Sequence, residues 1–161
     1  MFQRKINNDR LFFNAILHQL NKIARLCRKE IPGAHEHYQN IQENLNKLSQ
    51  QFTDEAKCFR AMLQKEEILK NKKITFHPRL SQKVIIENPL TINLMKLIEA
   101  YDELISIFKL LHLAGCFQST QDYYANIRRI QKIVNSALSQ VIFIHALELK
   151  KKKDLRSPLC D

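Results

Sequence analysis

The sequence predicts a mainly α-helical bundle, and three observations carry that prediction. The chain has 161 residues, of which 45% are hydrophobic, so it is long enough to bury one core. It contains only 2 glycines and 4 prolines, too few for the turns of a β-rich fold or for glycine loops that cradle phosphate. Its apolar residues recur at intervals of three and four, the helical period. We therefore expect a single helical domain over residues 1–149 and a basic, flexible tail over 150–161.

The first expected helix begins at Asn8 or Asp9, because both residue types cap helix N-termini. Apolar side chains then follow at a spacing of three and four as far as Cys27. The helix should end before Pro32-Gly33, since proline and glycine commonly follow helix ends.

Two further helices are expected before residue 70, which makes three over residues 8–70. The second covers about 34–51 and is rich in Gln, Asn and Glu, so it should lie on the surface. Thr53 is a typical N-cap, and the two acidic residues after it suit the first turn of a third helix.

A short extended segment is expected near residues 73–87. Polar and apolar residues alternate from Lys73 to His77, as in a half-buried strand. Lys83–Glu87 is rich in β-branched residues and predicts a second short strand, with a helical turn from Ser81 as the alternative.

The last two helices carry the clearest signals. Asn88-Pro89 is a cap followed by proline at the first helical position. An almost entirely apolar helix should run from Leu90 to Ala114, with Gly115 as its C-terminal cap. Such a helix needs cover on most sides, from its own domain or from a second subunit.

Residues 119–122 resemble a capping box for the final helix, which should extend to about Leu149. Only a few residues join it to the apolar helix before it. The sequence therefore predicts a long antiparallel helical hairpin over 89–149, covered by the three N-terminal helices.

Nothing in the sequence predicts catalysis, a metal or a cofactor. His35 and His37 stand two residues apart, so on a helix they point to different sides and are poorly placed to share a metal. No serine or cysteine lies in a recognisable nucleophile motif. Glu99, Asp102 and Glu103 are best interpreted as the solvated stripe of a buried helix. We therefore expect a protein that is not an enzyme.

The expected location is the cytoplasm. No stretch reaches the roughly 18 uncharged apolar residues that a membrane helix requires, and the start of the chain does not match a secretory leader. The 4 cysteines have no paired C-x-x-C spacing, so we expect reduced thiols.

The positive charge is concentrated in particular segments. The chain has 26 Lys+Arg against 16 Asp+Glu, a formal net charge of +10. Residues 1–33 hold seven basic and two acidic side chains, and residues 71–87 hold four basic and one acidic. Localised positive charge attracts phosphates by releasing counterions, so DNA is the expected partner.

Two groups of residues are the candidates for DNA contact. In the extended segment, Lys73, Thr75 and His77 would share one strand face and read bases in the major groove, with a solvated basic loop as the alternative. The other candidates would hold phosphates: Lys72, Arg79, Lys83, Arg128, Arg129 and Lys132. For the last three, a solvated helix face is the alternative.

The stretch from Asn88-Pro89-Leu90 through Gly115 and on to Arg128-Arg129 has a recognisable pattern. A helix start with proline, a Tyr101-Asp102 pair, a loop glycine and a helix with paired basic residues occur in that order. In this pattern the chain resembles the AcaB-like family of integrating conjugative element and conjugative plasmid regulatory proteins. Glu30–His35 also keeps the acidic residue, the proline and the alanine of a turn found in that family.

The resemblance implies a DNA-binding transcriptional activator of conjugative-transfer genes. It also implies ribbon-helix-helix character, and hence a homodimer whose paired strands enter the major groove. The alternative is a non-enzymatic helical adaptor that binds a protein of a transfer or secretion system through the apolar helix at Leu90–Ala114.

Overall fold

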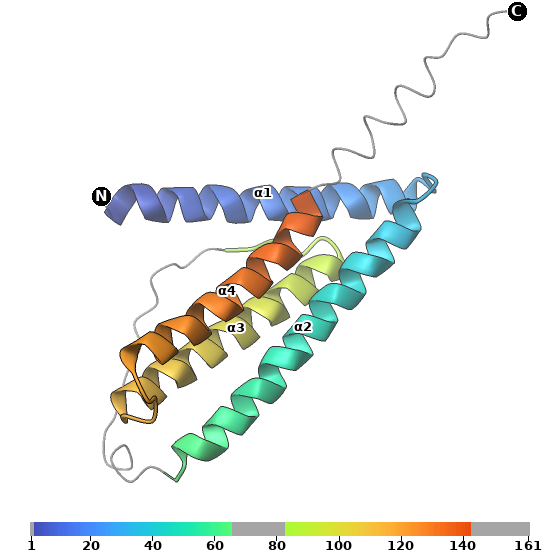
Figure 1. Ribbon diagram of the computed structural model, residues 1–161. Coiled ribbons are helices and arrows are strands. Elements are labelled where there is room, and N and C mark those ends of the chain that lie inside the picture. The colour runs from blue at the N-terminus through green and yellow to red at the C-terminus, as the bar shows by residue number, and fades with distance from the viewer. Residues whose placement is uncertain (1, 66–82, 143–161) are drawn as a thin grey trace, which may run out of the picture.

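Four helices make up the part of the chain that the computed structural model describes, residues 2–65 and 83–142. Their bounds are Phe2–Arg28 for α1, Ala34–Leu63 for α2, Pro89–Leu113 for α3 and Thr120–Ile142 for α4. α2, α3 and α4 run side by side, and α1 lies across one end of all three (Figure 1). The prediction of a mainly α-helical bundle is confirmed for these residues. No helix among them is long and apolar enough to cross a bilayer.

α1 begins earlier than the sequence predicted. The helix already includes Phe2, so Asn8 and Asp9 lie inside it and do not cap it. No glycine or proline interrupts residues 2–28, and the cap signal is therefore not enough to set the boundary. The predicted end is confirmed, because α1 stops at Arg28 and Pro32-Gly33 lies in the turn to α2.

The turn between α1 and α2 uses the left-handed region twice. Glu30 has φ 52° and Gly33 has φ 78°. Glycine adopts this conformation without steric penalty, whereas glutamate does so rarely. The Ile31 N–H still reaches back to the Leu26 carbonyl at 3.3 Å, which secures the end of α1.

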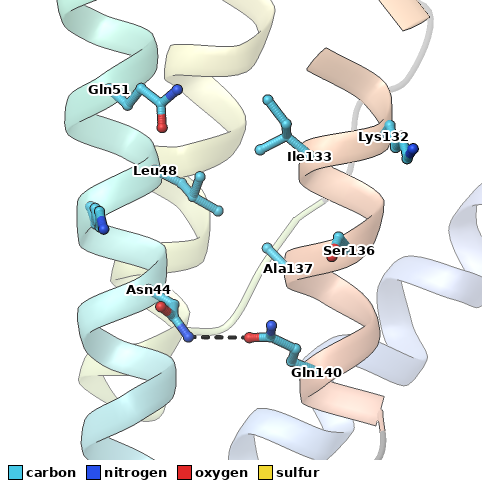
Figure 2. Close-up of a pocket in the computed structure, with 9 residues that line it drawn as sticks. Asn44, Leu48, Gln51, Lys132, Ile133, Ser136, Ala137 and Gln140 are labelled. Atoms are coloured by element: carbon cyan, nitrogen blue, oxygen red, sulfur yellow. Dashed lines mark hydrogen bonds between the residues drawn. The ribbon is translucent and has the colours of Figure 1, made fainter. Parts of the chain in front are cut away.

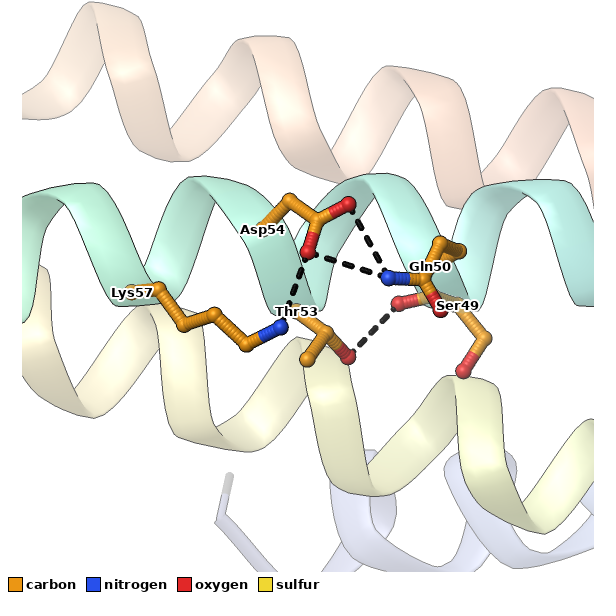
Figure 3. A network of polar contacts seen from close by, with 5 residues as sticks. All are labelled: Ser49, Gln50, Thr53, Asp54 and Lys57. Carbon is orange, nitrogen blue, oxygen red and sulfur yellow. Dashed lines mark hydrogen bonds and ion pairs between the residues drawn. The ribbon is translucent and has the colours of Figure 1, made fainter.

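α2 is one helix of 30 residues where the sequence predicted two. Thr53, the expected cap, donates its hydroxyl to the Ser49 carbonyl one turn earlier at 2.8 Å (Figure 3). Asp54 accepts from Gln50 and from Lys57, each at 3.0 Å. Residues that usually start a helix thus form hydrogen bonds inside a continuous helix. The helix continues because the buried Phe52 and Ala56 extend its apolar side past residue 51.

The predicted strand at Lys83–Glu87 is wrong. These residues form neither strand nor helix, and Ile85 and Ile86 are exposed. β-branched residues favour a strand only where a neighbouring strand pairs with them, and none is present among the described residues. The other half of the predicted extended segment, 73–82, lies outside the described residues.

α3 is the best-enclosed helix, as its composition predicted. Asn88 caps it by accepting the Thr91 N–H at 3.1 Å, and its own amide donates to Asn21 of α1. At the other end Gly115 has φ 76°, and the Cys116 N–H bonds the Leu111 carbonyl at 2.9 Å. Both predicted caps are confirmed. The cover comes from the chain's own helices α1, α2 and α4.

The main neighbour of α3 is α2. Leu97, Leu104 and Phe108 of α3 are fully buried, as is Phe52 of α2. The sequence had instead predicted that the last two helices would form the central pair of the fold. α4 does return alongside α3 after the turn at 114–119 (Figure 1), but the two helices contact less extensively than α2 and α3 do.

α4 begins as predicted. Ser119 Oγ accepts the Asp122 N–H at 3.1 Å, and its hydroxyl donates to the Asp122 carboxylate at 2.8 Å. The helix is described as far as Ile142, and the predicted continuation to Leu149 lies outside the described residues. Ile130 and Val141 are its most deeply buried side chains.

Candidate functional site between helices α2 and α4

A groove of about 460 Å³ lies between α2 and α4. Its floor is apolar and consists of Leu48, Ile133 and Ala137, which face one another across the gap (Figure 2). Its walls are polar and carry two lysines, three side-chain amides and a hydroxyl. These wall residues are Asn44, Lys47, Gln51, Lys132, Ser136 and Gln140.

The helical period of each wall explains why these side chains meet. On α2 the polar residues stand at 44, 47 and 51, which is i, i+3 and i+7, so they share one face. On α4 the polar residues stand at 132, 136 and 140, which is i, i+4 and i+8. Each helix alone presents a polar stripe, and the bundle brings the two stripes to the rim of one groove. The side chain of Lys132 itself lies on the side of α4 away from α2 (Figure 2).

Asn44 and Gln140 meet across one end of the groove. The Asn44 Nδ2 donates to the Gln140 Oε1 at 3.1 Å, across the gap between the two helices (Figure 2). Gln51 lies on the same wall two turns along α2 from Asn44 and points toward the gap. The groove is therefore bridged at this end by a hydrogen bond between two exposed side chains.

The lysines of the groove have no described carboxylate as a partner. Elsewhere on these helices acidic and basic side chains pair: Arg129 with Glu55, Arg60 with Glu103, and Lys57 with Asp54. Lys47, Arg128 and Lys132 are exposed and form no such ion pair among the described residues. The groove and the adjoining turn of α4 thus carry uncompensated positive charge.

The structure separates the predicted DNA contacts into three groups. Lys72, Lys73, Thr75, His77 and Arg79 lie outside the described residues. Lys83 is exposed in the irregular segment before α3.

The third group lies on α4. Arg128 and Lys132 are exposed one turn apart, and Lys132 lines the groove. Arg129 instead turns to Glu55 of α2, which compensates its charge. Sequence reasoning thus placed Lys132 in a candidate site but did not separate Arg129 from its neighbour.

Most of the groove was missed at the sequence level. Residues 34–51 were interpreted only as a surface helix because they are rich in amides. The spacing of Asn44, Lys47 and Gln51 was the available signal, since it places all three on one helical face. The spacing does not show which helix forms the opposite wall.

A thiol and an imidazole meet where α1 turns into α2. The Cys27 Sγ lies 3.5 Å from His35 Nδ1, and the Gln39 amide lies 3.0 Å from His35 Nε2. His37 points elsewhere: its Nε2 is buried without a hydrogen-bond partner, and burial lowers the pKa of its imidazole. The two histidines share no ligand position, and no group of three metal-ligating side chains occurs among the described residues.

His112 lies against an aromatic ring at the end of α3. Its imidazole stacks on Tyr123 at the start of α4, with ring centroids 4.3 Å apart and planes 8° from parallel. This contact ties the end of α3 to the first turn of α4.

Comparison with known proteins adds no relative to this picture. No protein-family model, no curated protein and no solved structure matches the chain.

Proposed function

We propose that this chain is a non-enzymatic DNA-binding regulator of genes of a conjugative or other mobile element, acting as a homodimeric transcriptional activator. The family resemblance supplies the genetic setting and the dimer. The net charge of +10 supplies the general affinity for a polyanion. The described surface supplies one specific place where that affinity can act.

The observation that carries the proposal is the set of unpaired cations around α4. Arg128, Lys132 and the facing Lys47 have no described acidic partner, although neighbouring bases on the same helices do. A cation without an ion pair can bind a phosphate without first breaking an internal salt bridge. Its binding therefore gains the whole free energy of counterion release from DNA. Arg128 and Lys132 stand four residues apart, so they follow one side of α4 and can contact successive phosphates.

Base reading belongs, in this proposal, to Lys73, Thr75 and His77, with phosphate contacts from Lys72, Arg79 and Lys83. Only Lys83 of this set is described, and it is exposed where such a contact requires it. Phosphate contacts on α4 would fix the position of the protein on the duplex, and the residues near 75 would supply sequence preference.

The test is a salt series of binding to duplex DNA, with promoter fragments of the host element and random duplexes of equal length. The full chain is compared with an Arg128→Ala/Lys132→Ala double variant and with Lys96→Ala as a matched control. Lys96 is also exposed, but it stands on α3 near Glu99 and Glu103. Molecular mass in the same buffer reports the oligomeric state.

We expect the double variant to bind more weakly to all duplexes and to lower the salt slope by about 2, one for each phosphate contact removed. Lys96→Ala should change neither. Lys73→Ala/Arg79→Ala should weaken binding too, with the larger loss on promoter fragments. An equal response of the double variant and Lys96→Ala would refute the α4 surface, and absence of promoter preference in the unaltered chain would refute the regulator.

The adaptor alternative lacks an observation in its favour. It relies on the apolar helix α3 as a docking surface, and the inward side chains of α3 are covered by the other helices. The large apolar side chains that α3 exposes are Ile92 and Leu113, which stand near its opposite ends and form no continuous surface.

A further inference from the structure

The turn between α1 and α2 brings a thiol, an imidazole and a side-chain amide together. The Cys27 Sγ lies 3.5 Å from His35 Nδ1, and the Gln39 amide lies 3.0 Å from the other ring nitrogen of His35. Cys27 belongs to the last turn of α1, and His35 and Gln39 stand one helical turn apart at the start of α2. This is the arrangement of a nucleophile, a base and a group that orients the base.

The backbone of the turn holds Cys27 close to His35. The Glu30 N–H donates to the Cys27 carbonyl at 3.0 Å, and the Ala34 N–H donates to the Ile31 carbonyl at 3.0 Å. These two bonds connect the end of α1 to the start of α2. The thiol and the imidazole are therefore brought together by the fold itself, without a bound ligand.

The amide of Gln39 suits an imidazole that gains and loses a proton. An amide carries both donors and an acceptor, so it bonds Nε2 of His35 whether or not that atom carries a hydrogen. The amide nitrogen stands next to the ring, and half a turn about the last side-chain bond exchanges it with the oxygen. With the oxygen toward the ring, Nε2 keeps its hydrogen and the Nδ1 lone pair faces the thiol. After Nδ1 takes the thiol proton, the bond from Nε2–H to the amide oxygen becomes stronger, because the ring is then a cation.

Tyr38 is a second titratable group close to the thiol. Burial, and next the negative charge of an ionised Cys27, raise the pKa of the Tyr38 hydroxyl, while Arg28 lowers it. A phenol with a raised pKa keeps its proton at neutral pH. The Tyr38 hydroxyl therefore does not compete with His35 for the thiol proton.

Exposure alone would rank the cysteines of α1 and α2 in the opposite order. Cys58 of α2 is exposed, whereas Cys27 is only partly exposed. Among the described residues, the imidazole that contacts a cysteine thiol by hydrogen bonding is that of His35, and it contacts Cys27. Higher reactivity at Cys27 than at Cys58 would therefore report the imidazole and not the access of the reagent.

We propose that Cys27 is a nucleophilic thiol that exchanges with low-molecular-weight disulfides, with His35 as its base and Gln39 as a positioning residue. The Cys27 Sγ attacks one sulfur of the disulfide while His35 Nδ1 takes the thiol proton. The S–S bond of the small molecule breaks, and the leaving thiolate takes that proton from the imidazolium. The products are a mixed disulfide on Cys27 and one free small thiol, so Cys27 is oxidised and the leaving half is reduced.

The test is reaction of the full chain with excess glutathione disulfide at pH 7, followed by mass spectrometry of the peptides that contain each cysteine. The rate at Cys27 is thus measured beside the rate at Cys58 in the same molecule. The variants are His35→Ala, Gln39→Ala and Gln39→Glu. His18→Ala is the matched control, because His18 is an exposed histidine on the same helix as Cys27. Circular dichroism reports whether each variant is folded.

We expect Cys27 to react about tenfold faster than Cys58, although it is less exposed. His35→Ala should slow Cys27 by about a hundredfold, the lower end of the effect of a general base, and should leave Cys58 unchanged. Added imidazole should restore part of the rate at Cys27 in this variant. Gln39→Ala should slow Cys27 less, and Gln39→Glu should restore the rate because it keeps an acceptor for Nε2–H. His18→Ala should change neither rate.

Two results would overturn the proposal. One is a rate at Cys27 no higher than that at Cys58 in the unaltered chain. The other is an unchanged rate at Cys27 in folded His35→Ala. If His35→Ala does not fold, the Gln39 variants decide: a loss in Gln39→Ala that Gln39→Glu restores supports the proposal, and equal rates overturn it. These reactions contain no DNA and do not involve α4, so their outcome is separate from that of the regulator proposal.

Discussion

α2 forms two very different contacts, one with α3 and one with α4. Toward α3 it presents buried apolar residues, and the contact is continuous and dry. Toward α4 it presents Asn44, Lys47 and Gln51, and a groove remains open between the helices. The same 30-residue helix therefore contributes one side to the buried core and another to an open, polar groove.

The difference follows from what each partner helix can bury. α3 is apolar on almost all sides, so close contact with α2 removes a large apolar area from water. α4 alternates apolar and polar positions and keeps Lys132, Ser136 and Gln140 hydrated. Close packing at these positions would bury polar groups without partners, which is unfavourable. Changes in the α2–α3 contact should therefore lower stability strongly, and changes in the groove should lower it little.

The largest effect is expected at Phe108 of α3. Its ring is fully buried and meets Phe59 of α2 edge-to-face, with centroids 4.9 Å apart. Phe108→Ala should lower the free energy of unfolding by about 3–5 kcal/mol, because it removes a large side chain and leaves a cavity. Urea unfolding followed by circular dichroism measures the loss.

Leu113 provides the control for that substitution. It stands on the same helix but is 62% exposed. Leu113→Ala should change the free energy of unfolding by less than about 0.5 kcal/mol. If the two variants lost similar stability, the α2–α3 contact would not be the dry core described above.

A smaller effect is expected at Asn88, where α3 begins. Its side chain accepts the Thr91 N–H and donates to Asn21 of α1, so it joins the helix cap to the crossing helix. Asn88→Ala should destabilise the chain by about 1–2 kcal/mol, from loss of the cap and of a partly buried hydrogen bond. Asn88→Asp keeps the acceptor and should recover part of the loss in the same unfolding measurement.

The ion pair between Arg129 of α4 and Glu55 of α2 should contribute less still. The side chain of Arg129 is 43% exposed and that of Glu55 is 19% exposed. A double-mutant cycle with Arg129→Ala and Glu55→Ala should give a coupling free energy of about 0.2–1 kcal/mol, which decreases with added salt. Coupling that does not respond to salt would contradict a solvent-screened pair.

His37 allows a test by pH, at the end of α2 that meets α1. Burial lowers the pKa of its imidazole below the ordinary 6.5, so the unfolded chain binds this proton more readily than the folded chain. Stability from this residue is complete above pH 6.5 and decreases as pH falls through 6.5 toward the folded pKa. His37→Gln should flatten that part of the curve of unfolding free energy against pH. An unchanged slope would show that other groups cause it.

The smallest effect on stability is expected in the groove. Lys132 is exposed and has no described partner, so Lys132→Gln should change the free energy of unfolding by less than about 0.5 kcal/mol. A loss of several kcal/mol would mean that the α2–α4 contact supports the fold in the way the α2–α3 contact does, and would remove the distinction between them.

Part of this architecture could be predicted because its signals are local. Asn88-Pro89, Gly115 and Ser119–Asp122 set helix ends through bonds to residues three to five positions away, and all three predictions hold. Thr53 and Asn8 carry similar signals, yet both lie inside helices. A cap residue permits a helix start, but it does not interrupt a helix whose apolar side continues through it.

The groove depended on information that no local pattern contains. The spacing of 44, 47 and 51 fixes one polar wall, and the spacing of 132, 136 and 140 fixes another, but about 80 residues separate them. The sequence also did not predict that Arg129 would find Glu55 while Arg128 and Lys132 stayed unpaired. Which charges are compensated depends on the helix that packs alongside.

The amino-acid sequence by itself determined that the chain is helical, basic and centred on an apolar segment at Leu90–Ala114, because composition and period act over a few residues. The tertiary structure alone decided that α2 is the main partner of α3 and that α2 and α4 leave a recess between them. Helices pack through the faces whose side chains fit together and bury the most apolar area. These faces belong to segments far apart in the chain, so no local pattern shows which of them will meet.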